Sequence, residues 1–524
     1  MNKTCKLLIS AALVGMAAFG IAGCGGGSSS KAPSDTLRVG VTNFADSLET
    51  TDNYFGWVVM RYGIGECLTK FDDKMNVTPW LSDKWEVSED HLTWTFHIND
   101  KAKFSNGNKV TAEAVKSSIE RVFQKSDRAT AAFKYTKMEA DGQNLKITTE
   151  SPTANLPGAL GDPLFIIIDT SVKDRDYRNM GPIATGPYVV KKFSKQLCEL
   201  DANPNYWDGE VPFKHLIIPS IDDPNTRAMS LQSGETDVIV NVASGDMQLF
   251  NDKSKYTISE IASLRAVLAR LNVSEGHPMH DKRVRDALIS ATDRKTYADT
   301  LLKGTFIPGG PVCPPSIDYG FDQLKDPNAY NPERAKKLLA EAGWKDTDGD
   351  GYVDKNGKPL EMDFVYYSSR AELPTFAEAT QADAKKVGIK INLKSVDYNV
   401  LDGISKSGEY DLSISNILAV QSGDPETYVN MYWKSNVNGS NPQNGSGYSN
   451  PEYDALSNQL AAEFDPAKRK EIIIKMQQII LDDGAALVFG YPKTNMVFSN
   501  NIAGARILPC DYYWVTKDIR PAGK

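Results

Sequence analysis

One kind of helix start recurs through the second half of the chain and restricts its fold more than any other feature. In the segment YNPERAKKLLAEAGW, Asn331 is a good N-cap, Pro332 sits at the first helical position and Gly343 follows the last turn. The same Asn-Pro or Asp-Pro start recurs at residues 450–451 and 465–466. These starts share capping chemistry and are not an internal repeat. Each one predicts a helix.

Strand patterns alternate with these helices along the chain. Residues 93–98 (TWTFHI) alternate aromatic or apolar with polar or small residues, as a half-buried strand does. Residues 389–396 form another short β pattern. Thr111 and Asp281 are good N-caps for two further amphipathic helices. The mixture predicts an α/β protein of several domains.

The N-terminus carries the pattern of an export signal. Two lysines precede an apolar stretch, residues 7–23, that is shorter than the about 20 residues a membrane-spanning helix needs. Residues 21–24 (IAGC) resemble the bacterial lipobox, in which the cysteine, here Cys24, is lipidated after cleavage. Residues 1–23 are then a signal peptide, and residues 24–36 are a lipidated, flexible Gly/Ser tether. An ordinary signal peptide with a chance cysteine and an uncleaved anchor are the alternatives.

Composition limits the class of function. The hydrophobic fraction of 41% is ordinary for a soluble globular protein, and the length after the signal suits about three domains. No second apolar run approaches spanning length. The net charge of −8, with no long basic run, argues against nucleic-acid binding, because phosphate contacts need a basic face.

The cysteine pattern excludes a CxxC metal or redox motif. Cys5 leaves with the signal and Cys24 takes the lipid, so four widely spaced cysteines remain: Cys67, Cys198, Cys313 and Cys510. In an exported chain they could form up to two disulfides or stay as free buried thiols. The sequence leaves both possibilities open.

Several blocks of the sequence, in order, resemble the substrate-binding proteins of the peptide/nickel class of ABC importers, solute-binding protein family 5. The most specific block contains an Asn-Pro-x-Tyr-Trp element and a Ser-Gly-Glu-x-Asp-Val element within LDANPNYWDGEVPFKHLIIPSIDDPNTRAMSLQSGETDV. The blocks are residues 91–122, 184–190, 200–238, 280–294, 331–344 and 447–459.

The resemblance implies a two-lobed α/β periplasmic-binding-protein fold of class II, with an extra subdomain in the first lobe and two hinge strands. The hinge candidates are Arg265–Leu271 and Ala486–Gly490. The implied divisions are lobe I at residues 37–67, 188–271 and 491–524, its extra subdomain at 68–187, and lobe II at 272–490.

The same resemblance implies a function without catalysis. The lobes would close over a small solute, a short peptide as the first expectation and a nickel or other metal chelate or an oligosaccharide as alternatives. The loaded protein would then dock on a membrane permease that works with ATPase subunits. We expect a monomer that needs no cofactor, binds no nucleic acid and is held at the membrane by lipid on Cys24, facing the periplasm or the cell exterior.

Pocket residues are carried over where family positions match. Asp424 begins the family's Asp-Pro turn, but Gln421 stands where peptide binders have an aspartate that pairs with the peptide α-amine, so that contact should be weaker. Nickel binders have a tryptophan near this chain's Ala419 and an arginine within residues 158–167, and both are missing here, although Arg128 matches another of their arginines. The candidate ligand residues are Tyr54, Trp57, Arg128, Asp162, Gln421 and Asp424.

An acidic loop, DTDGDGYVD, matches the first part of an EF-hand calcium loop. Its twelfth position is Gly357, where the EF-hand has a bidentate glutamate, so a complete EF-hand is not expected. A structural calcium site and a plain solvated turn are the two interpretations. The candidate ligands are Asp346, Asp348, Asp350, Tyr352 and Asp354.

An exported hydrolase and a ligand sensor are the rival classes. The sequence has no HExxH, GxSxG or Walker A motif. His277 and His280 could hold zinc, although a solvated loop is the favoured interpretation.

Overall fold

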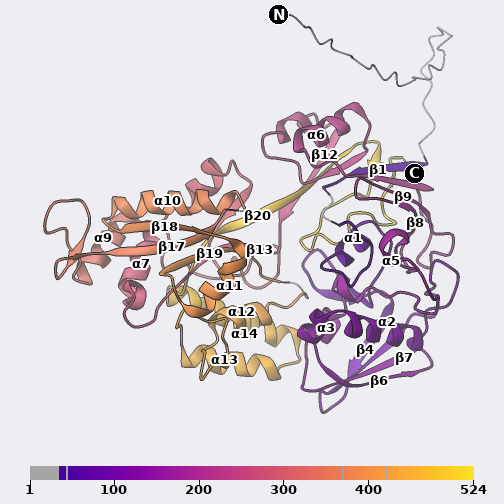
Figure 1. The fold of residues 1–524 in the computed structure, drawn as a ribbon, viewed down its shortest axis with the longest axis horizontal. Helices are drawn as coiled ribbons and strands as arrows, with labels where there is room; N and C mark the ends of the chain where they lie inside the picture. The colour runs from indigo at the N-terminus through magenta and orange to yellow at the C-terminus, as the bar shows by residue number, and fades with distance from the viewer. Residues whose placement is uncertain (1–34, 43–44, 369, 421, 524) are drawn as a thin grey trace, which may run out of the picture. The chain divides into compact units, whose positions relative to one another are not determined.

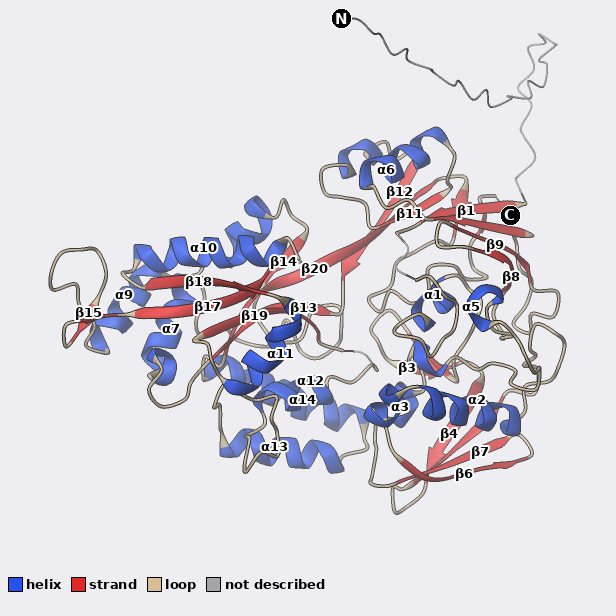
Figure 2. Ribbon diagram, viewed as in Figure 1, coloured by secondary structure: helices blue, strands red, loops and turns tan. Residues whose placement is uncertain are grey.

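A computed structural model describes residues 35–42, 45–368, 370–420 and 422–523 as a mixed α/β structure (Figures 1 and 2). Its main sheet has 12 strands. In spatial order they are β18 (Lys390–Val396), β17 (Glu361–Tyr367), β19 (Leu412–Leu418), β13 (Arg265–Leu271), β20 (Ala486–Ser499), β11 (Val238–Val240), β1 (Thr36–Gly40), β10 (His215–Pro219), β9 (Leu197–Ala202) and β8 (Tyr188–Phe193), with β12 (Tyr256–Ala262) and β14 (Phe306–Pro308) also paired with β20.

The long strand β20 connects the two halves of this sheet (Figure 2). Its first residues pair antiparallel with β13, where Leu487 lies opposite Ala269. Its last residues pair antiparallel with β11, where Val497 lies opposite Ile239. β13 covers the residues of the first hinge candidate and β20 begins with the second. Their role as hinges stays a prediction, as do the domain boundaries.

A separate four-stranded antiparallel sheet lies within the predicted extra subdomain, and α2 lies across one face of it (Figure 2). Phe96, Ile119 and Ile147 are fully buried in the core between them. Its strands in spatial order are β4 (Ser82–Val87), β5 (Thr93–Ile98), β7 (Asn144–Thr149) and β6 (Tyr135–Asp141). Three short pairs are β2 (Thr69–Phe71) with β3 (Val77–Pro79), β15 (Asp354–Lys355) with β16 (Lys358–Pro359), and β21 (Ile502–Ala503) with β22 (Arg520–Pro521).

Helices cover the sheets and supply most of the remaining core. The α-helices are α1 (Gly56–Arg61), α2 (Ala112–Lys125), α3 (Asp127–Ala132), α4 (Leu156–Ala159), α5 (Tyr177–Met180), α6 (Pro224–Ser233), α7 (Lys282–Ala291), α8 (Arg294–Thr296), α9 (Pro332–Glu341), α10 (Glu372–Lys386), α11 (Tyr398–Ser407), α12 (Glu426–Trp433), α13 (Pro451–Ala462) and α14 (Pro466–Asp482). Short 3₁₀ or π turns are η1 (Pro163–Phe165), η2 (Met247–Phe250), η3 (Pro278–His280) and η4 (Tyr297–Leu301). No helix in the described ranges is long and apolar enough to cross a membrane.

The predicted helix starts are confirmed. The Asn331 side chain accepts a hydrogen bond from the Arg334 backbone nitrogen at 2.9 Å, and Gly343 after the helix has a φ of +86°. Side chains of Thr111, Asp281, Asn450 and Asp465 cap their helices in the same way. The strand predicted at residues 93–98 is β5, and the one predicted at 389–396 begins one residue later as β18.

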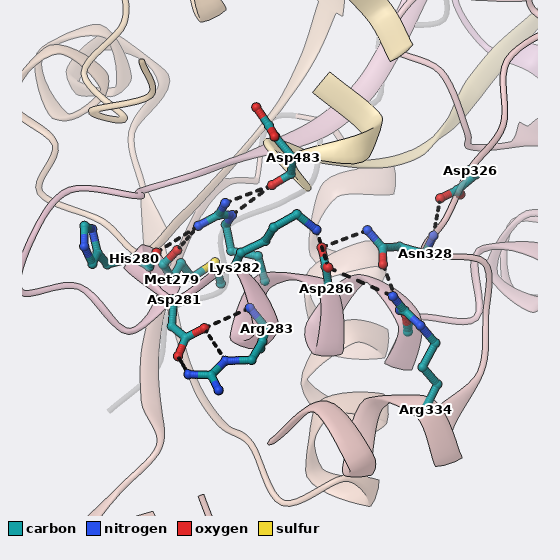
Figure 3. A network of polar contacts seen from close by, with 12 residues as sticks. Met279, His280, Asp281, Lys282, Arg283, Asp286, Asp326, Asn328, Arg334 and Asp483 are labelled. Carbon is teal, nitrogen blue, oxygen red and sulfur yellow. Dashed lines mark hydrogen bonds and ion pairs between the residues drawn. The ribbon is translucent and has the colours of Figure 1, made fainter. Parts of the chain in front are cut away.

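A polar network anchors α7 to neighbouring segments (Figure 3). The Arg285 guanidinium donates to the backbone oxygens of Met279, His280 and Asp483. The buried carboxylate of Asp286 accepts from Lys282 at 2.5 Å and from Asn328 at 2.9 Å. Because these partners lie on different segments, the network fixes α7 against the turn after α14 and the loop before α9.

Cys67, Cys198, Cys313 and Cys510 are free and buried. Burial raises the pKa of Cys198 and of Cys510 to about 12, and it also raises the pKa values of Cys67 and Cys313. Since the thiolate is the reactive form, these cysteines should be inert in the folded chain.

We therefore expect iodoacetamide at pH 8, without reductant, to leave all four unlabelled in the native protein and to label all four after unfolding in guanidinium. Peptide mass spectrometry measures the labelling at each position. A disulfide-linked peptide, or rapid native labelling at any of these positions, would contradict the structure.

Candidate ligand-binding site

A cavity of about 660 Å³ gathers four of the six predicted ligand residues, Tyr54, Arg128, Asp162 and Asp424. They come from the loop before α1, from α3, from the residue before η1 and from the loop before α12. Apolar and aromatic side chains form much of the remaining wall: Leu164, Phe165, Ile417, Leu418, Tyr428, Met431 and Tyr432. The contact of these residues with a ligand stays a prediction.

Arg128 brings a positive charge to this cavity. Its guanidinium lies 3.9 Å from the centre of the Tyr54 ring and donates to the Asn53 backbone oxygen at 2.5 Å. The ring face and the carbonyl fix the orientation of the guanidinium but only weakly offset its charge. Its ion-pair partner is Asp162, at a distance of 4.0 Å.

Asp162 has a structural role in the wall. It is buried, and one carboxylate oxygen accepts from the Leu164 backbone nitrogen at 2.8 Å, which caps η1. Its backbone oxygen accepts a hydrogen bond from the Cys67 thiol. Across the cavity wall, Asn155 donates to the Ser422 hydroxyl at 2.6 Å and so joins α4's N-terminal flank to the loop before α12.

Asp424 is held by groups within the chain. One carboxylate oxygen accepts from the Glu426 backbone nitrogen at 2.8 Å, and the other accepts from Arg469 Nε at 2.8 Å. Arg469 also donates to Glu426 Oε2 at 2.6 Å. Burial lowers the pKa of Arg469, but the charges and hydrogen bonds of the two carboxylates outweigh it and raise that pKa. Asp424 is therefore already paired with a cation within the chain.

Trp57 lies in a second cavity, of about 390 Å³, which shares Leu418 with the first. The Tyr54 and Trp57 rings, 5.9 Å apart, connect the two cavities. The Arg61 guanidinium lies 5.4 Å from the centre of the Trp57 ring and forms an ion pair with Asp511 at 2.5 Å. These contacts hold Arg61 against the Trp57 ring.

Sequence reasoning missed the charged residues of this second cavity. Arg265, Arg370 and Lys493 line it, together with the carboxylates of Glu372 and Asp511. Arg370 is exposed and has no ion pair or side-chain hydrogen bond with any residue in the described ranges. It lies in the sequence between β17 and α10, where nothing in the sequence pattern distinguishes it from a solvated loop residue.

The model of bacterial extracellular solute-binding proteins, family 5, matches residues 76–440, well over half of the chain. The chain belongs to this family. Its general function is therefore that of the extracellular substrate-binding component of an ABC importer.

Named relatives of this family 5 chain bind different solutes. The nickel-binding protein NikA of Staphylococcus aureus is 30% identical to it over 80% of the chain and 82% of its own length. The oligopeptide-binding protein AppA of Bacillus subtilis is 25% identical over 86% of each chain. A crystal structure of a nickel ABC transporter protein from Bacillus halodurans superimposes with a TM-score of 0.83 at 24% identity and covers 92% of this chain and 99% of its own, which shows a shared two-lobed fold.

Two predicted residues of the family 5 chain lie outside the described ranges. These are Gln421 and the lipidation candidate Cys24. Ligand contact by Gln421 and lipidation of Cys24 stay predictions.

The acidic loop of the family 5 chain gathers three carboxylates. Asp346, Asp348 and Asp354 each place one oxygen within 4.8 Å of the others. Asp350 is not in this group, and its carboxylate accepts from the Tyr352 backbone nitrogen at 2.8 Å.

Calcium binding by this loop stays a prediction. We expect calcium to raise the melting temperature of chelator-treated protein and to have no such effect on an Asp346→Asn variant. An unchanged melting temperature in the wild type would show that the segment is a turn.

The histidines make no site of their own. His277 Nδ1 pairs with Asp411 at 2.8 Å, its Nε2 lies 3.2 Å from the Asn272 amide nitrogen, and His280 Nδ1 is bonded to the Val273 backbone oxygen. Both ring nitrogens of His277 are thus occupied, which disfavours the zinc interpretation. No histidine is among the residues that line either cavity.

Proposed function

We propose that this family 5 protein captures a small carboxylate-bearing solute, in the first place a short peptide, and delivers it unchanged to a membrane permease and its ATPase. The proposal rests mainly on Arg128, a cation whose charge faces the larger cavity with only a 4.0 Å ion pair to offset it. Arg370 offers a second cation in the neighbouring cavity.

A carboxylate is the natural partner for these arginines. A planar guanidinium donates two parallel hydrogen bonds to a carboxylate, and such charge-assisted bonds are stronger than neutral ones. Asp424 and Glu426 are less available to an amine, because both are already hydrogen-bonded to Arg469. Recognition should therefore depend on the acid end of the solute.

The rest of the cavity suits a peptide. Aromatic and aliphatic walls can bury side chains, and polar groups such as Asn155 and Ser422 can bond to a peptide backbone. Nothing in this arrangement requires chemistry on the solute, so we propose capture without turnover.

A metal chelate is the second candidate, favoured by the nickel-binding relatives. Among the described residues, the lining of the larger cavity has no imidazole or thiolate to coordinate a bare nickel ion. Nickel would have to arrive already chelated, with the chelator's carboxylates bound by Arg128.

We expect Arg128→Ala to weaken solute binding about tenfold to a hundredfold, because it removes charge-assisted hydrogen bonds to the carboxylate. Native mass spectrometry of the wild type identifies the co-purified solute, and calorimetry then measures its affinity for the wild type, for Arg128→Ala and for Arg370→Ala. Arg520→Ala, an exposed arginine outside both cavities, is the matched control. Unchanged affinity in Arg128→Ala would contradict the proposed site, and a hydrolysed solute would contradict capture without turnover.

A further inference from the structure

A buried arginine on β13 packs against the helices α11 and α12 and has no ion-pair partner in the described ranges. Arg270 on β13 is 6% exposed. It donates to the Ser405 hydroxyl of α11 at 2.5 Å, and its guanidinium lies 5.1 Å from the centre of the Tyr432 ring of α12. Its Nε–H has no acceptor, and no ion pair joins Arg270 to a carboxylate of the described chain.

Two buried hydroxyls near Arg270 also have no hydrogen-bond partner in the part of the chain that the structure describes. They belong to Tyr410, which is 2% exposed, and to Ser413, which is fully buried. Ser413 lies directly opposite Arg270 in the antiparallel pairing of β13 and β19, so the two side chains share one face of the sheet. The charge of Arg270 acts on the Tyr410 hydroxyl, opposing the rise in the Tyr410 pKa that burial causes.

Three unpartnered polar groups in one buried place need a common explanation. Buried polar atoms in folded proteins almost always have a hydrogen-bond partner. A buried cation is more costly still, because hydrogen bonds alone do not neutralise its charge. A water molecule could accept the hydrogen bonds, but only a negative charge would also compensate the guanidinium.

We propose that Arg270, Tyr410 and Ser413 form a buried binding site for a small anion of the halide class, separate from solute capture. All three groups can donate a hydrogen, and a small spherical anion accepts from several directions. A carboxylate of the captured solute would supply the same chemistry from a second source, because Tyr432 borders both Arg270 and the larger cavity.

Crystallography with bromide distinguishes a bound halide from a carboxylate of the captured solute. The protein is unfolded, freed of solute by dialysis and refolded with bromide as the only halide, and diffraction is measured at the bromine absorption edge. We expect an anomalous peak within hydrogen-bond distance of Arg270 Nε, Tyr410 Oη and Ser413 Oγ. A carboxylate at this place in directly purified crystals, with no bromide peak after refolding, would contradict a separate halide site and assign the anion to the solute. Water alone or empty density in both crystals would overturn the proposal.

Thermal unfolding gives an independent test. The wild type should melt at a higher temperature in chloride than in gluconate, which is too large for the site, at equal ionic strength. Tyr410→Phe should need about tenfold more chloride for the same stabilisation, because it loses one donor to the anion. Arg270→Met should lose the chloride response and still fold, since buried charges are often replaced by apolar side chains without loss of stability.

Tyr330→Phe, at an exposed tyrosine, is the matched control and should respond to chloride as the wild type does. An identical chloride response in the wild type, Tyr410→Phe and Arg270→Met would overturn the proposal.

Discussion

Raising the pH from 5 to 8 is expected to lower the free energy of unfolding of the wild type by about 3 kcal/mol more than that of a Glu66→Gln variant. Glu66 follows α1 and is 1% exposed, and its carboxylate accepts hydrogen bonds from Tyr206 Oη at 3.1 Å and Trp207 Nε1 at 2.8 Å. Burial raises the pKa of Glu66 from 4.5 to about 7, although these hydrogen bonds oppose the rise.

The sign follows from proton binding. Between pH 4.5 and 7 the folded chain keeps the Glu66 proton while the unfolded chain has lost it, so stability falls as pH rises through this window. Below 4.5 both states are protonated, and above 7 both are ionised. Glutamine resembles the protonated acid and does not titrate, so the variant should match the wild type near pH 5 and exceed its stability at pH 8.

Urea unfolding at intervals of half a pH unit measures this difference. Other titrating groups act equally on both proteins, so only the difference between the two curves reports Glu66. Glu89→Gln, at an exposed position, controls for the loss of one negative charge. Parallel curves for the wild type and Glu66→Gln would mean that Glu66 ionises normally in the folded chain.

The features predictable from sequence were those set by neighbouring residues. Asn331, Thr111 and Asp281 cap helices because a cap depends on two or three residues in a row. The strand at residues 93–98 was predictable because alternation along a strand is equally local. The order of family blocks then gave the fold class, which local patterns alone could not supply.

The charged parts of the site depend on residues far apart in the chain. The sequence places Asp424 in a pocket turn, but it does not show that Arg469, 45 residues later, occupies its carboxylate. Glu66 looks like any surface glutamate until the Asn-Pro-x-Tyr-Trp segment covers it. Arg270 lies in an apolar strand pattern, and its lack of a counter-charge appears only when α11 and α12 pack over it. Charge compensation is thus the property that tertiary structure decides.

Replacing Arg469 with methionine is expected to cost about 3–5 kcal/mol of stability, because it leaves two partly buried carboxylates without their cation. Arg469 is 4% exposed, and its guanidinium bonds to Asp424 and Glu426. The same group donates to the backbone oxygens of Leu460 and Glu463, so it also holds the turn between α13 and α14.

Two further variants separate charge from packing. In Arg469→Met combined with Asp424→Asn and Glu426→Gln, no unpaired carboxylate remains, and about half or more of the lost stability should return. Lys470→Met removes the neighbouring side chain on the same helix, whose ion pair with Asp318 at 2.7 Å lies at the surface. That control should change stability by about 1 kcal/mol or less.

The same variants test how the wall of the larger cavity is held. Asp424 accepts a hydrogen bond from the backbone nitrogen of Glu426, the first residue of α12. An unpaired Asp424 should therefore repel the carboxylate of a bound solute and loosen the helix that carries Tyr428 and Tyr432. Solute affinity should therefore fall in Arg469→Met and recover in the triple variant, in step with the unfolding free energy measured in urea. If the triple variant recovered its stability but not its solute affinity, the lost charge of Asp424 would be needed for binding. Asp424 would then contact the solute directly, for example by pairing with an amine end.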